Sequence, residues 1–129
     1  FNDPSVQFSV EDILISPVTE LYDAIVSFDV IEHIYPEHVE GFFAAVKARL
    51  KPEGICFIGT PSLISQQFAS EVSKKGHVNI YDPERLQAEI ERHFTFTFQF
   101  AANDEVVHTG YLPLAHYLIV IGSKKKNES

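Results

Sequence analysis

Residues 22–62 decide the fold, and they read YDAIVSFDVIEHIYPEHVEGFFAAVKARLKPEGICFIGTPS. Residues 23–31 are almost continuously apolar and rich in β-branched side chains, which predicts a strand buried on both faces of a parallel sheet. Apolar side chains then recur at helical spacing over residues 39–50, which predicts a helix with one buried stripe. Residues 55–60 predict a second buried strand, so the whole stretch is a strand, helix, strand unit.

Weaker patterns lie on both sides of this unit. Residues 6–10 alternate apolar and polar side chains, which predicts a short strand. Asp82 and Pro83 favour the start of a helix, because an aspartate can cap the first turn and proline suits its first position. Residues 62–80 show weak periodicity, which is typical of a short helix or a lid.

Two strands without a helix between them complete the predicted order. Residues 94–100 place a phenylalanine at every second position, and we expect this side of the strand to pack in the core against helices. Residues 116–121 form the last predicted strand, and the two strands predict an antiparallel hairpin at one edge of the sheet. The prediction is one α/β domain over residues 1–123, followed by a disordered tail at 124–129.

The composition limits the function before any motif is considered. The chain has 129 residues, of which 45 % are hydrophobic, so it can build one packed domain. Its formal charge of −8 argues against a nucleic-acid partner, and no apolar run reaches the length of a membrane span. The single cysteine, Cys56, excludes an internal disulfide. No secretory signal pattern is visible, so the sequence predicts a cytoplasmic protein.

Several short motifs of the 22–62 stretch together resemble the class I S-adenosylmethionine-dependent methyltransferases. They are Tyr22-Asp23 at the first strand, Glu32-His33 in the turn after it, Leu50-Lys51-Pro52-Glu53-Gly54 after the helix, and Thr60-Pro61 at the end of the second strand. Residues 76–86 are similar to the family's lead into its penultimate helix, so the resemblance reaches from residue 6 to residue 122. It implies a Rossmann-like sheet and an enzyme that transfers methyl groups, with O-methylation of a small molecule, sugar or lipid precursor favoured.

The chain departs from the family pattern at its start. The family's first strand ends in a glycine-rich loop that lets the cofactor approach bare backbone, whereas no two glycines here lie within four residues of each other. The resemblance therefore implies the C-terminal part of a methyltransferase domain, without the first βαβ unit. Without that unit the strand at 23–31 has an unpaired edge, which predicts a homodimer or a strand-swapped assembly. The alternative is a non-catalytic methyltransferase-like module that acts through protein–protein association.

The resemblance also implies residues that bind S-adenosylmethionine. Asp12 stands in the place of the family's acid after its third strand, so the resemblance implies that Asp12 and Ile13 lie at the adenine. The adenine amino group can donate a hydrogen bond to a carboxylate. Ser27, Phe28 and Asp29 match the turn that lines the methionine part of the cofactor. These five residues are the predicted cofactor-binding set.

Carboxylates and histidines follow the strand at 23–31. Asp29, Glu32 and His33 are spaced i, i+3 and i+4, so a helical turn beginning at Asp29 would point all three in one direction. With His77 as a fourth ligand they suit a divalent metal such as Mg²⁺ or Mn²⁺. The set is similar to that of the metal-assisted small-RNA 2′-O-methyltransferases and ubiquinone-pathway O-methyltransferases, where a metal would lower the pKa of the acceptor hydroxyl. In the metal-free alternative Glu32 braces the turn, and His33 or His77 is the general base.

Overall fold

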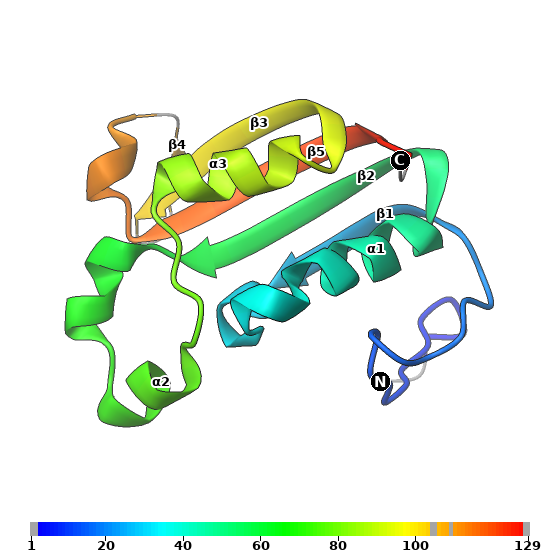
Figure 1. The fold of residues 1–129 in the computed structure, drawn as a ribbon, viewed down its shortest axis with the longest axis horizontal. Coiled ribbons are helices and arrows are strands. Elements are labelled where there is room, and N and C mark those ends of the chain that lie inside the picture. The colour runs from blue at the N-terminus through cyan, green and yellow to red at the C-terminus, as the bar shows by residue number, and fades with distance from the viewer. Residues whose placement is uncertain (1–2, 104–105, 109, 128–129) are drawn as a thin grey trace.

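Figure 1 shows the computed structural model, which describes residues 3–103, 106–108 and 110–127. Its centre is one five-stranded sheet, made of β1 (Tyr22–Phe28), β2 (Leu50–Pro61), β3 (Phe94–Asn103), β4 (Val106–His108) and β5 (Tyr117–Lys125). The helices are α1 (Val39–Arg49), α2 (Glu71–Gly76) and α3 (Pro83–Glu91). Four 3₁₀ turns join them, namely η1 (Ile31–His33), η2 (Pro36–His38), η3 (Leu63–Phe68) and η4 (Leu112–Leu114). In the described residues, no helix is long and apolar enough to cross a membrane.

The strands lie side by side in the order β1-β2-β5-β3-β4. β1 and β2 are parallel and α1 connects them, whereas all the other neighbouring strands are antiparallel. The predicted α/β sheet with a parallel unit and an antiparallel pair is therefore confirmed. The predicted burial of residues 23–31 on both faces is wrong, because β1 ends at Phe28 and has one neighbouring strand in the described sheet, and Val26 and Phe28 are 62 % and 47 % exposed. β5 is the last strand in sequence yet lies between β2 and β3, and the short β4 forms the outer edge where the sequence suggested only a loop.

Helices α1 and α3 lie along the same face of the sheet and build the core there (Figure 1). The stripe predicted over residues 39–50 is buried as expected, and Phe43 and Val46 are completely inaccessible to solvent. The buried side chains from the two helices and the sheet beneath them include Phe42, Phe43, Val46, Leu86, Ile90, Cys56, Ile58, Phe94, Leu118 and Val120. We call this side of the sheet the covered face.

We call the other side of the sheet the open face. It carries apolar side chains, and no helix of the described residues covers them. The strand register aligns Val26 with Phe57, Phe57 with Ile121, and Ile121 with Phe98, so these four side chains form one row across the sheet. Val26 is 62 % exposed and Phe98 is 59 % exposed. The row is therefore continuous, apolar and largely accessible at both of its ends.

The expectation that all the phenylalanines of residues 94–100 pack against helices is wrong. Phe94 is buried, but Phe96 and Phe98 lie on the open face and are exposed. The polar side chains between them face α3 instead, where the Gln87 amide donates a hydrogen bond to the Thr97 hydroxyl at 2.9 Å. Alternation shows that a strand has two different sides, but it does not show which side a helix covers.

The predicted strand at residues 6–10 is also wrong. These residues form no strand, and Phe8 and Val10 are exposed. An isolated strand leaves its backbone groups unpaired, and the sheet offers this segment no neighbour with which it pairs. The chain instead turns at Asp12, whose carboxylate accepts a hydrogen bond from the backbone N–H of Leu14 at 2.9 Å.

The predicted disordered tail begins too early. β5 continues to Lys125, whose ammonium donates hydrogen bonds to the backbone carbonyls of Lys47 and Leu50 at 2.8 and 2.6 Å. The Lys126 ammonium likewise donates to the carbonyl of Glu91 at 2.7 Å. A cation suits the carbonyl-rich end of a helix, so these lysines fix the C-terminal ends of α1 and α3. Residues 128–129 of the predicted tail lie outside the described residues.

Candidate functional site

The candidate site lies at the edge of the sheet where the parallel strands β1 and β2 end. Phe28 is paired with Gly59 in the strand register, and the backbone N–H of Asp29 donates to the Gly59 carbonyl at 3.0 Å. Turn η1 follows immediately and carries Glu32 and His33. In open α/β sheets, ligands bind outside the carboxyl ends of the parallel strands. The predicted cofactor residues Ser27, Phe28 and Asp29 all lie at this edge.

Glu32 anchors the site from inside the protein. Its side chain is only 1 % exposed, and its Oε1 accepts a hydrogen bond from the Thr60 hydroxyl at 2.9 Å. Its backbone carbonyl accepts hydrogen bonds from the N–H groups of Val78 and Asn79 at 2.9 and 3.0 Å. Glu32 therefore joins η1 to the end of β2 and to the segment that precedes α3.

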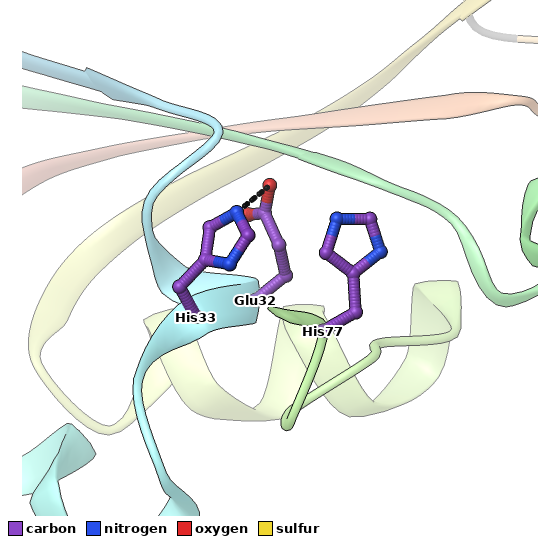
Figure 2. Close-up of side chains that lie close together, drawn as sticks. All are labelled: Glu32, His33 and His77. Carbon is purple, nitrogen blue, oxygen red and sulfur yellow. Dashed lines mark ion pairs between the residues drawn. The ribbon is translucent and has the colours of Figure 1, made fainter. Parts of the chain in front are cut away.

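His33 presents a free nitrogen to this buried carboxylate. Its Nδ1 lies 2.7 Å from the backbone carbonyl of Gly76. Because a carbonyl only accepts hydrogen bonds, Nδ1 carries the proton, and the neutral ring keeps its lone pair on Nε2. That Nε2 lies 3.8 Å from Oε2 of Glu32 (Figure 2). Since the His33 side chain is about half exposed, its Nε2 can meet both Glu32 and a ligand from solution.

His77 has the same arrangement on the facing segment. Its Nδ1 lies 3.0 Å from the amide oxygen of Gln66, so Nδ1 is the donor and Nε2 carries the lone pair. The rings of His33 and His77 lie edge to face with centroids 5.0 Å apart, and both point toward the Glu32 carboxylate (Figure 2). The structure thus brings His77 to η1, as the sequence predicted, although 43 residues separate His33 from Gly76, the residue just before it.

These three side chains could together hold a metal ion. Glu32, His33 and His77 each place a ligand atom within 4.8 Å of the others. In both imidazoles, Nδ1 donates a hydrogen bond to an oxygen acceptor and Nε2 is left for a ligand. Such a hydrogen bond orients histidine ligands in metalloproteins. Two imidazole nitrogens and one carboxylate suit Mn²⁺, Fe²⁺ or Zn²⁺ better than Mg²⁺, which prefers oxygen ligands.

Asp29 does not belong to this cluster, so the argument from i, i+3, i+4 spacing is wrong. Asp29 has φ 60°, in the left-handed region, and η1 begins only at Ile31. No helical turn therefore connects Asp29 with Glu32 and His33. The Asp29 carboxylate instead accepts a hydrogen bond from the Tyr117 hydroxyl at 3.0 Å.

Asp12 and Ile13 lie away from this edge. The backbone carbonyl of Asp12 accepts from the N–H of Ser16 at 2.9 Å, and the Ser16 carbonyl accepts from Arg49 at 2.8 Å. Arg49 ends α1 and directly precedes β2, so this turn lies at the amino ends of the parallel strands. Ile13 packs against the core. The structure therefore does not bring the predicted adenine residues together with Ser27, Phe28 and Asp29.

Sequence reasoning missed the residues that orient the site. The Thr60 hydroxyl, the Gln66 amide, the Gly76 carbonyl and the Tyr117 hydroxyl each hold a predicted site residue. Thr60 was visible within the Thr60-Pro61 motif. The other three gave no signal, because their partners are distant in sequence and a backbone carbonyl has no residue preference.

A second group of ligand-type side chains, Glu40, Glu89 and His93, joins α1 to α3. Arg92 forms ion pairs with both carboxylates, and Nε2 of His93 donates to Glu89 at 3.1 Å. The hydrogen bond from His93 lowers the pKa of the Glu89 carboxyl, and the positive charge of Arg92 adds to this effect. Because Arg92 already balances the carboxylates, this group is a structural ion-pair cluster.

The fold is a Rossmann-like α/β sheet with a candidate ligand site at the carboxyl edge of its parallel strands. The sequence model of a methyltransferase domain matches residues 2–93, which is most of the chain. The chain therefore belongs to this methyltransferase-domain family. No curated protein matches the chain significantly.

Solved methyltransferases share this fold at low sequence identity. The N-methyltransferase NodS from Bradyrhizobium japonicum WM9, in complex with S-adenosylhomocysteine, is 16 % identical with a TM-score of 0.58, over 93 % of this chain and 54 % of NodS. A SAM-dependent methyltransferase from Archaeoglobus fulgidus is 17 % identical with a TM-score of 0.63, over 90 % of this chain and 66 % of that one. A candidate O-methyltransferase from Nostoc punctiforme PCC 73102 is 11 % identical with a TM-score of 0.61, over 90 % and 35 %. The chain thus spans 35 to 66 % of the length of these structures.

Proposed function

We propose that this chain forms the acceptor side of a methyltransferase site and supports O-methylation of a small molecule, sugar or lipid precursor. One observation carries the proposal: at the carboxyl edge of β1 and β2, the Nε2 atoms of His33 and His77 converge on the buried carboxylate of Glu32. This arrangement suits removal of a proton from a hydroxyl group. The negative charge of the chain favours such a substrate over RNA.

In this proposal, His33 is the general base. Its Nε2 accepts the acceptor's hydroxyl proton, while the Gly76 carbonyl keeps the ring in the required tautomer. The Glu32 carboxylate stabilises the positive charge that His33 gains. S-adenosylmethionine, when bound, supplies a methyl group on a positively charged sulfur. In this proposal Ser27, Phe28 and Asp29 bind its methionine part, and their location at the carboxyl end of β1 supports this assignment.

The same donor atoms fit a divalent metal, which is the alternative form of this proposal. Glu32, His33 and His77 would hold the ion, and their outer hydrogen bonds support that role. A bound metal would supply Lewis acidity that lowers the pKa of the acceptor hydroxyl. The two forms differ in a measurable property, because only the second binds Mn²⁺ through both histidines.

Calorimetric titration of the 129-residue chain with S-adenosylhomocysteine, with and without Mn²⁺, tests the proposal. We expect saturable binding with Kd tighter than about 100 μM, or roughly −5.5 kcal/mol. Absence of binding would contradict it and would favour a non-catalytic methyltransferase-like module. Mn²⁺ binding that is lost in His33→Gln and in His77→Gln but kept in the control His38→Gln would select the metal form. His38 is a suitable control because it is exposed and lies outside the cluster.

Self-association of two copies is part of the proposal. β1 has one neighbouring strand, β2, in the described sheet, so its other edge is free to pair. The apolar open face continues to that edge through Val26. Light scattering over a range of concentrations tests this point, and a monomer at every concentration would contradict it.

A further inference from the structure

Tyr117, the first residue of β5, contacts the strained turn at the end of β1. Its hydroxyl donates a hydrogen bond to Oδ1 of Asp29 at 3.0 Å, although 88 residues separate the two in sequence. Among the described residues other than glycine, only Asp29 and Lys124 have positive φ. Aspartate tolerates this conformation better than most residues, but it still requires support from its surroundings. The Tyr117 hydroxyl and the Gly59 carbonyl hold the side chain and the backbone N–H of Asp29.

The Tyr117 ring is itself held in a space that only glycine leaves open. A Cβ atom at Gly59 would lie 2.8 Å from both Cε2 and the hydroxyl oxygen of Tyr117, and 2.5 Å from Cδ1 of Phe28. The rings of Tyr117 and Phe28 meet edge to face at 6.2 Å between centroids. Gly59 therefore admits both rings, and Tyr117 lies with one edge on Phe28 and its hydroxyl on Asp29.

Burial, followed by the hydrogen bond to Asp29, raises the pKa of the Tyr117 hydroxyl. The hydroxyl therefore remains protonated and donates to Asp29 throughout the neutral pH range. Its role toward Asp29 is that of a fixed donor rather than of a proton carrier.

We infer that Tyr117 is a positioning residue for the proposed site, which holds Asp29 in its left-handed conformation and thereby sets the direction in which the chain leaves β1 for η1. Phe28 lies directly before this change of direction, Asp29 lies at it, and Glu32 and His33 follow it. One hydroxyl on β5 thus controls both the predicted cofactor turn and the acid–base cluster. The effect on cofactor binding rests on the proposed function, whereas the effect on the Asp29 turn does not.

The inference is tested with Tyr117→Phe, which removes only the hydroxyl, and with Tyr111→Phe as a control, since Tyr111 is 71 % exposed. In S-adenosylhomocysteine titrations we expect Tyr117→Phe to weaken binding about tenfold, the usual effect of losing one hydrogen bond to a charged group. Tyr111→Phe should leave the affinity unchanged. In an Asp29→Gly background, Tyr117→Phe should have no further effect, because the hydroxyl then has no carboxylate to hold.

A second measurement decides the inference even if the chain binds no S-adenosylhomocysteine. In backbone NMR spectra, Tyr117→Phe should shift the amide signals of residues 28–33 and speed hydrogen exchange of the Asp29 amide, whereas Tyr111→Phe should not. Signals that change only around Tyr117 would overturn the inference, as would an unchanged affinity in a chain that does bind. Failure of the wild-type chain to bind, combined with the expected NMR changes, would count against the proposed function and not against the role of Tyr117.

Discussion

The covered and open faces of the sheet are built from alternate residues of the same strands, yet they have different environments. On β5, Leu118 and Val120 are fully buried beneath the helices. Ile119 and Ile121, their neighbours in sequence, lie on the open face and are only partly buried. Both faces are apolar, so residue type alone does not determine which side chains become the core.

This difference can be explained by the composition that is typical of parallel strands. The strands of a parallel unit are covered on both faces in α/β proteins, and their sequences are therefore apolar on both sides. β1 and β2 keep that composition here, although α1 and α3 lie on one face only. The open face is therefore the surface on which the proposed self-association would bury apolar side chains. The comparison leads to four predictions, in order of decreasing effect.

The largest expected difference in unfolding free energy is between truncations of two phenylalanines of β3. Phe94 is 1 % exposed on the covered side, and its truncation by Phe94→Ala should cost about 3–5 kcal/mol of unfolding free energy. Phe98 is 59 % exposed on the open face, so Phe98→Ala should cost less than about 1 kcal/mol. Urea unfolding of both variants measures the difference. Equal losses would show that the open face is covered in solution.

Two glycines provide the next comparison. A Cβ atom at Gly122 would lie 2.5 Å from Cγ of the buried Phe94, so Gly122→Ala should cost about 1–3 kcal/mol through overpacking. Gly59→Ala would meet Phe28 and Tyr117, which are partly exposed and can move, so the loss of stability should be smaller. Thermal unfolding measures both changes. A larger loss from Gly59→Ala would mean that the Phe28 and Tyr117 rings are as rigid as the core.

A smaller effect, which depends on pH, is expected between the two helices of the covered face. The pKa of the Glu89 carboxyl lies below its ordinary value of 4.5, first because His93 donates a hydrogen bond to it. Its stabilising contribution is therefore complete above pH 4.5 and is lost as the pH falls through the lower value of the folded state. The stability difference between wild type and Glu89→Gln should shrink as the pH falls below 4.5. Glu84→Gln, at an exposed position of the same helix, controls for the loss of one negative charge from α3.

The last prediction is the absence of a reaction. Burial on the covered face raises the pKa of the Cys56 thiol to about 12, so the reactive thiolate is scarce near neutral pH. Cys56 should therefore resist 5,5′-dithiobis(2-nitrobenzoate) until urea unfolds the chain. A thiol moved to the open face by Ile55→Cys, in a Cys56→Ala background, should react at once, because Ile55 is 38 % exposed. Rapid reaction of Cys56 in the folded chain would contradict the burial of this face.

The sequence predicted those parts of the fold in which a local pattern reports a local structure. The apolar stripe of α1, the parallel strands on either side of it and the cap at Asp82 all follow from spacing within a few residues. Residues 6–10 had a strand pattern, but a strand also requires a neighbour, and no local pattern supplies one. The prediction of which side of β3 is covered was wrong for a similar reason, since it depends on the tertiary packing of β3 against α3, where Gln87 and Gln99 form hydrogen bonds between the two elements.

The site could be predicted only where its residues form a sequence motif. Glu32-His33 was visible, and His77 was found in the segment before α3. Spacing suggested that Asp29 shares a helical turn with them, but the left-handed conformation of Asp29 cannot be read from spacing. The role of Tyr117 depends on which strand lies beside β2, and that is a property of the whole sheet.

The position of β5 affects how this chain folds during its synthesis. A ribosome completes β1, β2, β3 and β4 before β5, yet β5 joins β2 to β3 in the finished sheet. Until β5 emerges, β2 and β3 each lack a neighbouring strand on one side, where they expose backbone groups that can pair with other chains. The sheet therefore closes late, through contacts that are distant in sequence, and such closure is slow. A nascent chain paused before residue 117 should be the form most prone to aggregation and the best substrate for a chaperone.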